Sequence, residues 1–310
     1  MVGAILMSAA LLEITRLFVR SLPALGRRPR TIEFYEYVLT ALIKFLGSRP
    51  IQSITTLDLR VHLGDLRDRR HVTLATLSCH IRAIRRFFRW ALQEGYVSAN
   101  PASALQLPRL PKLYPYVLTL DQVRQLLAAC TIVTFEGRRL RIFILLIVGT
   151  GLRLSEVLGL RREDLDLHLG HVLVRDGKGG RPRVVPLDSV LVLALTDYLQ
   201  QRRVDSPWLF CAKDGRQLTR RRAHRALRQL GKRAGLTGVR VSPHTLRHTF
   251  ATVFLEQGGN LESLRQFLGH STLAITSAYL HLSVGASRQI MERCSPLRAL
   301  APLRQQRQGR

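Results

Sequence analysis

The sequence predicts a mainly helical protein of two domains, with a small β-sheet in the second domain. Its 310 residues are enough for two domains of ordinary size. Apolar residues recur at helical spacing through the first third of the chain, and three prolines within eight residues follow. Later, a glycine-rich turn joins two strand-like stretches, which predicts the sheet.

The formal net charge of +27 indicates a polyanionic partner, most simply nucleic acid. The four cysteines form no CxxC pair, so neither a zinc site nor a disulfide framework is expected, and we predict a cytoplasmic protein. The apolar run 142–148 is too short to span a bilayer. Residues 1–12 lack the basic start of a signal peptide and are interpreted as part of a core helix. No membrane partner is predicted.

Residues 1–107 are expected to form an all-helical first domain. Its helices are predicted at 4–21, 31–47, 56–68 and 73–94. The last of them has an apolar stripe on one face and four arginines on the other, which suits a helix laid against DNA. A solvated basic face is the alternative for each of these arginines. They are Arg82, Arg85, Arg86 and Arg89.

Residues 108–117 are predicted to be a stiff linker, because their prolines cannot continue a helix. Thr119 and Gln122 then form a capping box that starts the second domain, 118–310, which ends in a basic tail. Strands are expected at 171–175 and 181–187. One helix is expected to start at Arg153. The other helices are expected at 120–130, 138–149, 188–201, 218–234, 244–257, 261–268 and 272–282. The helix 218–234 is dense in basic residues, and its candidate phosphate contacts are Arg221, Arg222 and Arg225.

The most informative stretch lies in the helix 244–257. His244, Arg247 and His248 recur at i, i+3 and i+4, so they share one face. A guanidinium beside an imidazole suits a phosphate. The guanidinium holds the phosphate oxygens, and the imidazole moves a proton near neutral pH. A zinc helix of the H-E-x-x-H type is excluded because residue 245 is threonine. His248 is interpreted as a packed helix histidine.

Other candidates lie elsewhere in the second domain. Arg153 is near a helix N-terminus, Lys178 is at the tip of the hairpin turn, and His270 follows a helix-ending glycine. The Tyr279 hydroxyl is a candidate covalent nucleophile. The alternatives are a surface arginine at 153, a solvated lysine at 178 and a half-buried core tyrosine at 279. No carboxylate cluster suited to a two-metal nuclease accompanies them.

Three motifs resemble those of the tyrosine recombinase (phage integrase) family, and most closely its compact Xer-like members. They are Thr150-Gly151-Leu152-Arg153-Leu154-Ser155-Glu156, His244-Thr245-Leu246-Arg247-His248, and Leu268-Gly269-His270-Ser271 with Tyr279 nine residues after His270. The resemblance covers about 118–282 and implies that the helical domain before it is a SAM-like, core-binding DNA-binding domain.

The resemblance also implies a role for each residue. Arg153 and Arg247 match the arginines that bind the phosphate, and His270 matches a supporting hydrogen-bond donor to it. Tyr279 matches the nucleophile that forms a 3′-phosphotyrosyl link. His244 matches the residue that accepts a proton beside the tyrosine.

Lys178 matches the hairpin lysine that protonates the 5′-oxygen, with Lys213 as a competing candidate. The resemblance implies catalysis without a cofactor, a metal or ATP. The implied partner is double-stranded DNA with an inverted-repeat core site, bound by a homo- or hetero-tetramer that passes through a Holliday junction. A type IB topoisomerase-like enzyme and a catalytically silent DNA-binding relative remain as alternatives. The biological role, in a mobile element or in chromosome maintenance, stays open.

Overall fold

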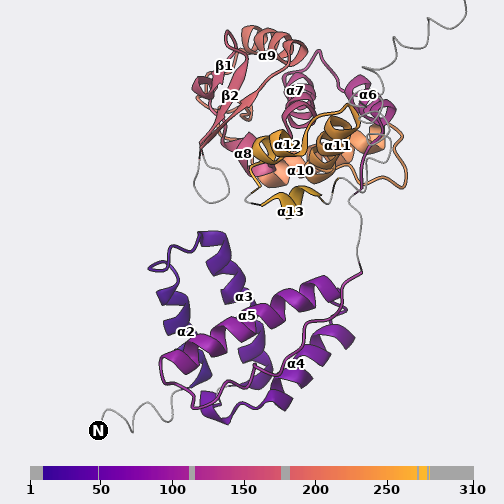
Figure 1. Cartoon of the computed structure of the whole chain (residues 1–310). Coiled ribbons are helices and arrows are strands. Elements are labelled where there is room, and N and C mark those ends of the chain that lie inside the picture. Colours follow the sequence, from indigo (N-terminus) through magenta and orange to yellow (C-terminus); the bar gives the residue numbers. More distant parts are fainter. Residues whose placement is uncertain are drawn as a thin grey trace, which may run out of the picture. The chain divides into compact units, whose positions relative to one another are not determined.

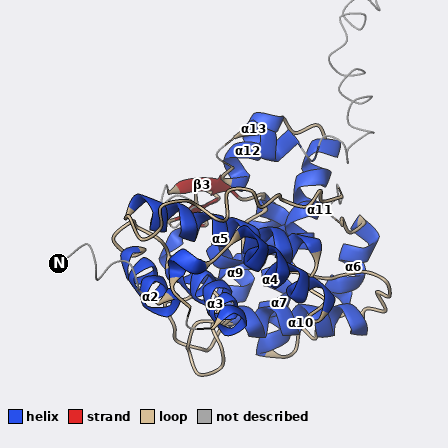
Figure 2. Cartoon of the chain, turned by 90° about the horizontal axis from the view of Figure 1, so that it is seen from below, coloured by secondary structure: helices blue, strands red, loops and turns tan. Residues whose placement is uncertain are grey.

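The computed structural model describes residues 10–47, 49–111, 116–175, 182–270, 272–277 and 279. The chain divides into two units, Met1–Lys112 and Leu113–Arg310, and their boundary falls within the predicted linker 108–117. Helices dominate the described parts of both units, and the described strands all belong to the second unit (Figure 2). The prediction of a mainly helical chain with one small sheet is therefore confirmed.

The described part of the first unit has four helices around one apolar core. Phe18 lies at its centre, with its ring 5.5 Å from that of Phe87 and 5.2 Å from that of Trp90. The predicted helix 4–21 is observed from residue 11, and residues 1–9 lie outside the described residues. A short 3-10 turn, Ile51–Ser53, precedes α4. The helices are α2 (Leu11–Ser21), α3 (Pro29–Leu46), α4 (Thr56–Asp68) and α5 (Leu74–Gln93).

In the second unit, α7 is the central helix and packs against both α9 and α11 (Figure 1). Its last two turns are almost wholly buried, as the apolar run 142–148 predicts. The helices are α6 (Leu120–Ala128), α7 (Phe135–Thr150), α8 (Leu154–Gly159), α9 (Ser189–Gln201), α10 (Arg220–Arg233), α11 (Pro243–Glu256), α12 (Leu261–Leu268) and α13 (Leu273–Thr276).

The sheet has three antiparallel strands in the order β1-β2-β3. They are β1 (Leu165–Asp166), β2 (His171–Val174) and β3 (Arg183–Pro186), with a 3-10 turn, Arg162–Asp164, before β1. Val174 pairs with Arg183 at the end of the predicted hairpin, whereas β1 was not predicted. Lys178 and the rest of 176–181 lie outside the described residues.

Several helix ends are observed as specific contacts. Thr119 and Gln122 form the capping box at the start of α6, and the Asn260 side chain caps α12. Gly269 ends α12 in the left-handed conformation, at φ +62°. The predicted helix 272–282 is observed only as α13, Leu273–Thr276, while most residues beyond it lie outside the described ranges.

Gly151 ends α7 in a position that no other residue fits. Its φ is +66°, and a Cβ there would lie 2.7 Å from a Leu268 methyl carbon and closer still to the Phe250 ring. We expect Gly151→Ala to lower the free energy of unfolding by about 2–5 kcal/mol, from backbone strain together with overpacking. Urea denaturation of the full chain measures this change.

Gly159→Ala is the matched control, because a Cβ at Gly159 meets nothing within 4 Å. This change should leave stability within about 1 kcal/mol of wild type, on the stabilising side. Equal effects of the two substitutions would contradict the account of Gly151.

Candidate active site

Helix α11 brings Arg247 to the ends of α7 and α12. The Ser242 side chain accepts a hydrogen bond from the Thr245 backbone N–H, and Pro243 occupies the first turn, where its missing N–H costs nothing. The helix therefore starts at a defined residue. Helix α12 packs against both α11 and α13 (Figure 1).

The Arg247 guanidinium is buried, with only 5% of the residue exposed. Its Nη1 donates to the Gly151 carbonyl at 2.7 Å, and its Nη2 donates to the Leu268 carbonyl at 2.9 Å. Nη2 also lies 3.0 Å from His270 Nε2. Burial, and then the nearby charge of Arg153, lower the pKa of Arg247 to about 10. The group is still charged at neutral pH and is held in one orientation.

His270 is held between α12 and α13. Because Gly269 turns the chain at the end of α12, the imidazole lies over the ring of Tyr279, with centroids 6.5 Å apart and planes 9° from parallel. Its Nδ1 lies 2.9 Å from Thr276 Oγ1. The sequence-predicted residues Arg247, His270 and Tyr279 are thus brought together.

Arg153 joins this group from the start of α8. Its Nη2 donates to the Gly269 carbonyl at 3.2 Å, and its Nη1 donates to Glu156 Oε1 at 3.0 Å. Glu156 Oε2 also accepts from the backbone N–H of Arg153 at 2.8 Å, which caps α8. Glu156 therefore both orients Arg153 and caps the helix.

Arg183 is a partner of the site that sequence reasoning missed. From β3, its Nη1 and Nη2 donate to the two carboxylate oxygens of Glu156 at 3.0 and 2.8 Å, and its Nε donates to the Phe267 carbonyl at 2.9 Å. Burial alone would raise the pKa of Glu156, but the hydrogen bonds and charges of Arg183 and Arg153 outweigh it and lower that pKa. Nothing in the local sequence distinguishes Arg183 from its many neighbouring arginines.

Tyr279 is 4% exposed and packs among apolar residues that include Phe250 and Leu264. Its Oη lies 2.8 Å from Nδ1 of His248. Burial raises the pKa of the tyrosine hydroxyl, although Arg247 and Arg153 oppose the shift. The interpretation of His248 as merely a packed histidine is therefore incomplete, since it contacts the candidate nucleophile.

His244 lies one turn before His248, with its side chain exposed at the start of α11. Partial burial and the charge of Arg247 lower its pKa. Lys213, the competitor of Lys178, pairs with Glu136 at 3.0 Å, near the start of α7. Gly151 lies at the other end of this helix, about 20 Å away at 1.5 Å per residue, so the structure separates Lys213 from the site.

The candidate DNA-binding arginines lie on the outer faces of two amphipathic helices. On α5, Arg82 and Arg89 are exposed, and Arg85 and Arg86 are half-buried. On α10, the three candidates are exposed, while the opposite face is buried by Ala223, Leu227 and Leu230. The exposed residues are Arg221, Arg222 and Arg225.

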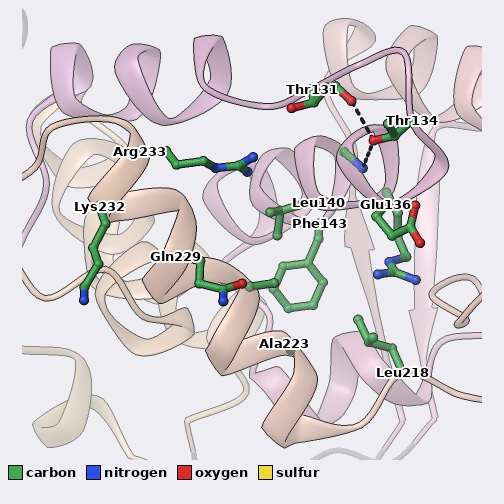
Figure 3. Close-up of a pocket in the computed structure, with 13 residues that line it drawn as sticks. Thr131, Thr134, Glu136, Leu140, Phe143, Leu218, Ala223, Gln229, Lys232 and Arg233 are labelled. Atoms are coloured by element: carbon green, nitrogen blue, oxygen red, sulfur yellow. Dashed lines mark hydrogen bonds between the residues drawn. The ribbon is translucent and has the colours of Figure 1, made fainter.

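A cavity of about 580 Å³ lies between α10 and the start of α7 (Figure 3). Its floor is apolar, with Leu140 and Phe143, while Gln229, Lys232 and Arg233 from α10 line another side. None of the described candidate catalytic residues lines it. Within the described ranges, no group of three or more His, Cys, Asp or Glu side chains could hold a metal ion. No described helix is long and apolar enough to cross a membrane.

Comparisons with known proteins match both units of the chain. A model of the phage integrase family matches residues 116–285, and a model of the phage integrase N-terminal SAM-like domain matches 15–97. The chain is 34% identical to the tyrosine recombinase XerC of Oceanobacillus iheyensis, over 86% of this chain and 90% of that one. It is 32% identical to XerA of Pyrococcus furiosus, over 93% and 96%. A lambda integrase tetramer bound to a Holliday junction has a TM-score of 0.74 at 20% identity, covering 90% of this chain and 80% of that one.

Removing Arg183 should destabilise the second unit. Arg183→Met leaves the buried carboxylate of Glu156 with Arg153 as its remaining guanidinium partner among the described residues. Because Glu156 keeps Arg153, the expected cost is that of losing hydrogen bonds to a buried charged group, about 1.5–3 kcal/mol. Urea denaturation, followed by the fluorescence of Trp208 in this unit, measures the effect.

Arg124→Met provides the comparison, because Arg124 forms an exposed pair with Asp121 on α6. Its cost should stay below about 1 kcal/mol. If Arg183→Met cost no more than this control, the buried cluster would not support the site as described.

Proposed function

Because this chain belongs to the phage integrase family and is a tyrosine recombinase of the Xer type, we propose that it cuts and rejoins DNA at specific sites through a covalent link to Tyr279. One observation carries the proposal. Arg153, Arg247, His270 and Tyr279 come from four separate segments, and hydrogen bonds and ring stacking unite them. The type IB topoisomerase-like reading has no specific observation in its favour.

The two arginines supply the charge that a phosphodiester needs. Arg247 is fixed by the carbonyls of Gly151 and Leu268, and Arg153 by Glu156. Guanidinium groups that are already oriented can stabilise the charge developing on the phosphate without reorganising during the reaction. We propose that a phosphate oxygen accepts hydrogen bonds from Arg247 and His270, in place of the contact that these two side chains make with each other.

The proposed step exchanges one phosphoester bond for another. The Tyr279 oxygen bonds to phosphorus, the bond from phosphorus to the 5′-oxygen breaks, and Lys178 protonates that oxygen. The 3′-phosphotyrosyl link keeps the bond energy, so a second 5′-hydroxyl can reverse the step on another strand. This sequence of bonds needs neither ATP nor a metal.

We propose that His244 also takes part in the proton transfers of this reaction. Its lowered pKa leaves the imidazole neutral at pH 7, and its exposed position at the start of α11 lets it exchange protons with solvent or DNA. The exposed arginines of α5 and α10 are proposed to contact DNA phosphates.

The proposed substrate is double-stranded DNA with an inverted-repeat core, bound by four protomers that exchange strands through a Holliday junction. The lambda integrase structure bound to such a junction supports this assembly by its fold. A DNA-binding protein without catalysis is the other candidate, and the arrangement of Tyr279 beside two arginines and two histidines disfavours it.

Covalent capture tests the chemistry. Wild-type protein mixed with fragmented DNA from its source, then denatured in detergent, should retain DNA fragments that share an inverted-repeat core. Tyr279→Phe should retain none while binding DNA with nearly unchanged affinity, because only the nucleophilic oxygen is lost. Sequencing of the protein-linked fragments provides the measurement. Equal capture by the variant would exclude Tyr279 as the nucleophile.

Salt dependence tests the electrostatic contribution to binding. About 6–10 phosphate contacts would reduce affinity by roughly 10³–10⁵ between 50 and 200 mM salt. Arg225→Gln should lower the slope by about one, and Arg124→Gln, on α6, should leave it unchanged. Titration of a captured site at several salt concentrations gives these slopes, and a flat response would contradict the role of the arginines.

A further inference from the structure

The hydroxyl of Tyr279 meets a histidine that the roles above leave unused. Nδ1 of His248 lies 2.8 Å from Tyr279 Oη, with the ring centroids 5.5 Å apart and the planes at 44°. We propose that His248 is the direct acceptor of the Tyr279 proton during cleavage, a role that rests on the proposed recombinase function. Nδ1 accepts the proton when the imidazole carries its hydrogen on Nε2.

The other polar neighbours of Tyr279 are poorly suited to take this proton. Arg247 lies close enough to influence the hydroxyl, but a guanidinium has donors and no acceptor. His270 lies parallel to the tyrosine ring, and its two nitrogens meet Arg247 and Thr276. With Tyr279 only 4% exposed, bulk water is also an inefficient acceptor. Among the residues that the structure describes, His248 is the acceptor with suitable geometry.

The protonation state of His248 suits this role. Burial, then the nearby His244 and Arg247, lower its pKa to about 4, so the imidazole is neutral at pH 7. The groups around the pair are His244 and Arg247 on α11, Arg153 at the start of α8, and His270 after α12. Because the tyrosine pKa is raised, the proton stays on Oη in the resting site. It moves as the bond to phosphorus forms, when the anionic phosphate favours a charged imidazole.

In the proposed cleavage step, the Oη–H bond of Tyr279 breaks and the proton passes to His248 Nδ1. At the same time Oη bonds to phosphorus, and the bond from phosphorus to the 5′-oxygen breaks. The leaving oxygen takes its proton from Lys178, as in the proposed function. On rejoining, the imidazolium of His248 returns the proton to Oη. His244 lies one turn away on the same face and is exposed to solvent.

Two substitutions separate proton transfer from simple positioning. In His248→Asn, the side-chain oxygen lies near the place of Nδ1 and still accepts a hydrogen bond, but it cannot take the proton. His248→Ala removes both functions. His168→Asn makes the same chemical change at an exposed turn between β1 and β2 and is the control. The probe is a nicked duplex carrying a site captured by the wild-type protein, and the readout is the single-turnover rate of adduct formation.

We expect both His248 variants to form the adduct at least about 10²-fold more slowly than wild type. DNA affinity and thermal midpoint should stay close to wild type in His248→Asn, and the control should react normally. The wild-type rate should also fall on acidification as His248 becomes protonated, and this fall should be weaker in His248→Asn.

A wild-type rate in His248→Asn would overturn the proposal, because the hydrogen bond alone would then be sufficient. A rate that falls on acidification as steeply in His248→Asn as in wild type would also overturn it. Failure of the wild-type protein to form any adduct, or an adduct with Tyr279→Phe, would instead overturn the proposed function. The His248→Asn variant therefore tests the role of His248, whereas the wild-type protein and Tyr279→Phe test the proposed function.

Discussion

The site depends on one buried positive charge. Arg247 lies among apolar residues, where an unpaired guanidinium would be prohibitively costly, and the carbonyls of Gly151 and Leu268 satisfy it. Each carbonyl is available because a helix ends at that point, α7 in one case and α12 in the other. The left-handed Gly151 lets the end of α7 approach Phe250 of α11 closely, and the left-handed Gly269 lets the end of α12 lie against the Arg183 guanidinium. Packing and the proposed phosphate binding therefore depend on the same contacts.

A second set of contacts extends this arrangement to the sheet. Glu156 holds Arg153 on one side and Arg183 on the other, and Arg183 continues to the Phe267 carbonyl. Through these bonds, β3 supports both the start of α8 and the turn that carries His270. The strand directly follows the segment that bears Lys178. A displacement of β3 would therefore affect the start of α8, the turn that carries His270 and the segment that bears Lys178.

Local patterns in the sequence predicted the helices and most of their ends, because caps such as Thr119 and Asn260 act within four residues. They also identified Arg153, Arg247, His270 and Tyr279 as one set, through motif spacing and family resemblance. They did not predict β1, the contact of His248 with Tyr279, or the role of Arg183. These features depend on residues 27 to 84 positions apart, or on a bridge too short to leave a periodic pattern. Helical spacing predicts which helix face carries His248, but it does not predict which residues contact that face.

Positive charge exceeds negative charge around Glu156. Among the described residues of this cluster, three guanidinium groups, those of Arg153, Arg183 and Arg247, accompany a single carboxylate. Their mutual repulsion opposes folding until an anion enters. An anion that binds the native state alone would therefore stabilise the second unit, and under the proposed function that anion is a DNA phosphate. The excess of positive charge that would attract the phosphodiester is then the same feature that opposes folding without it.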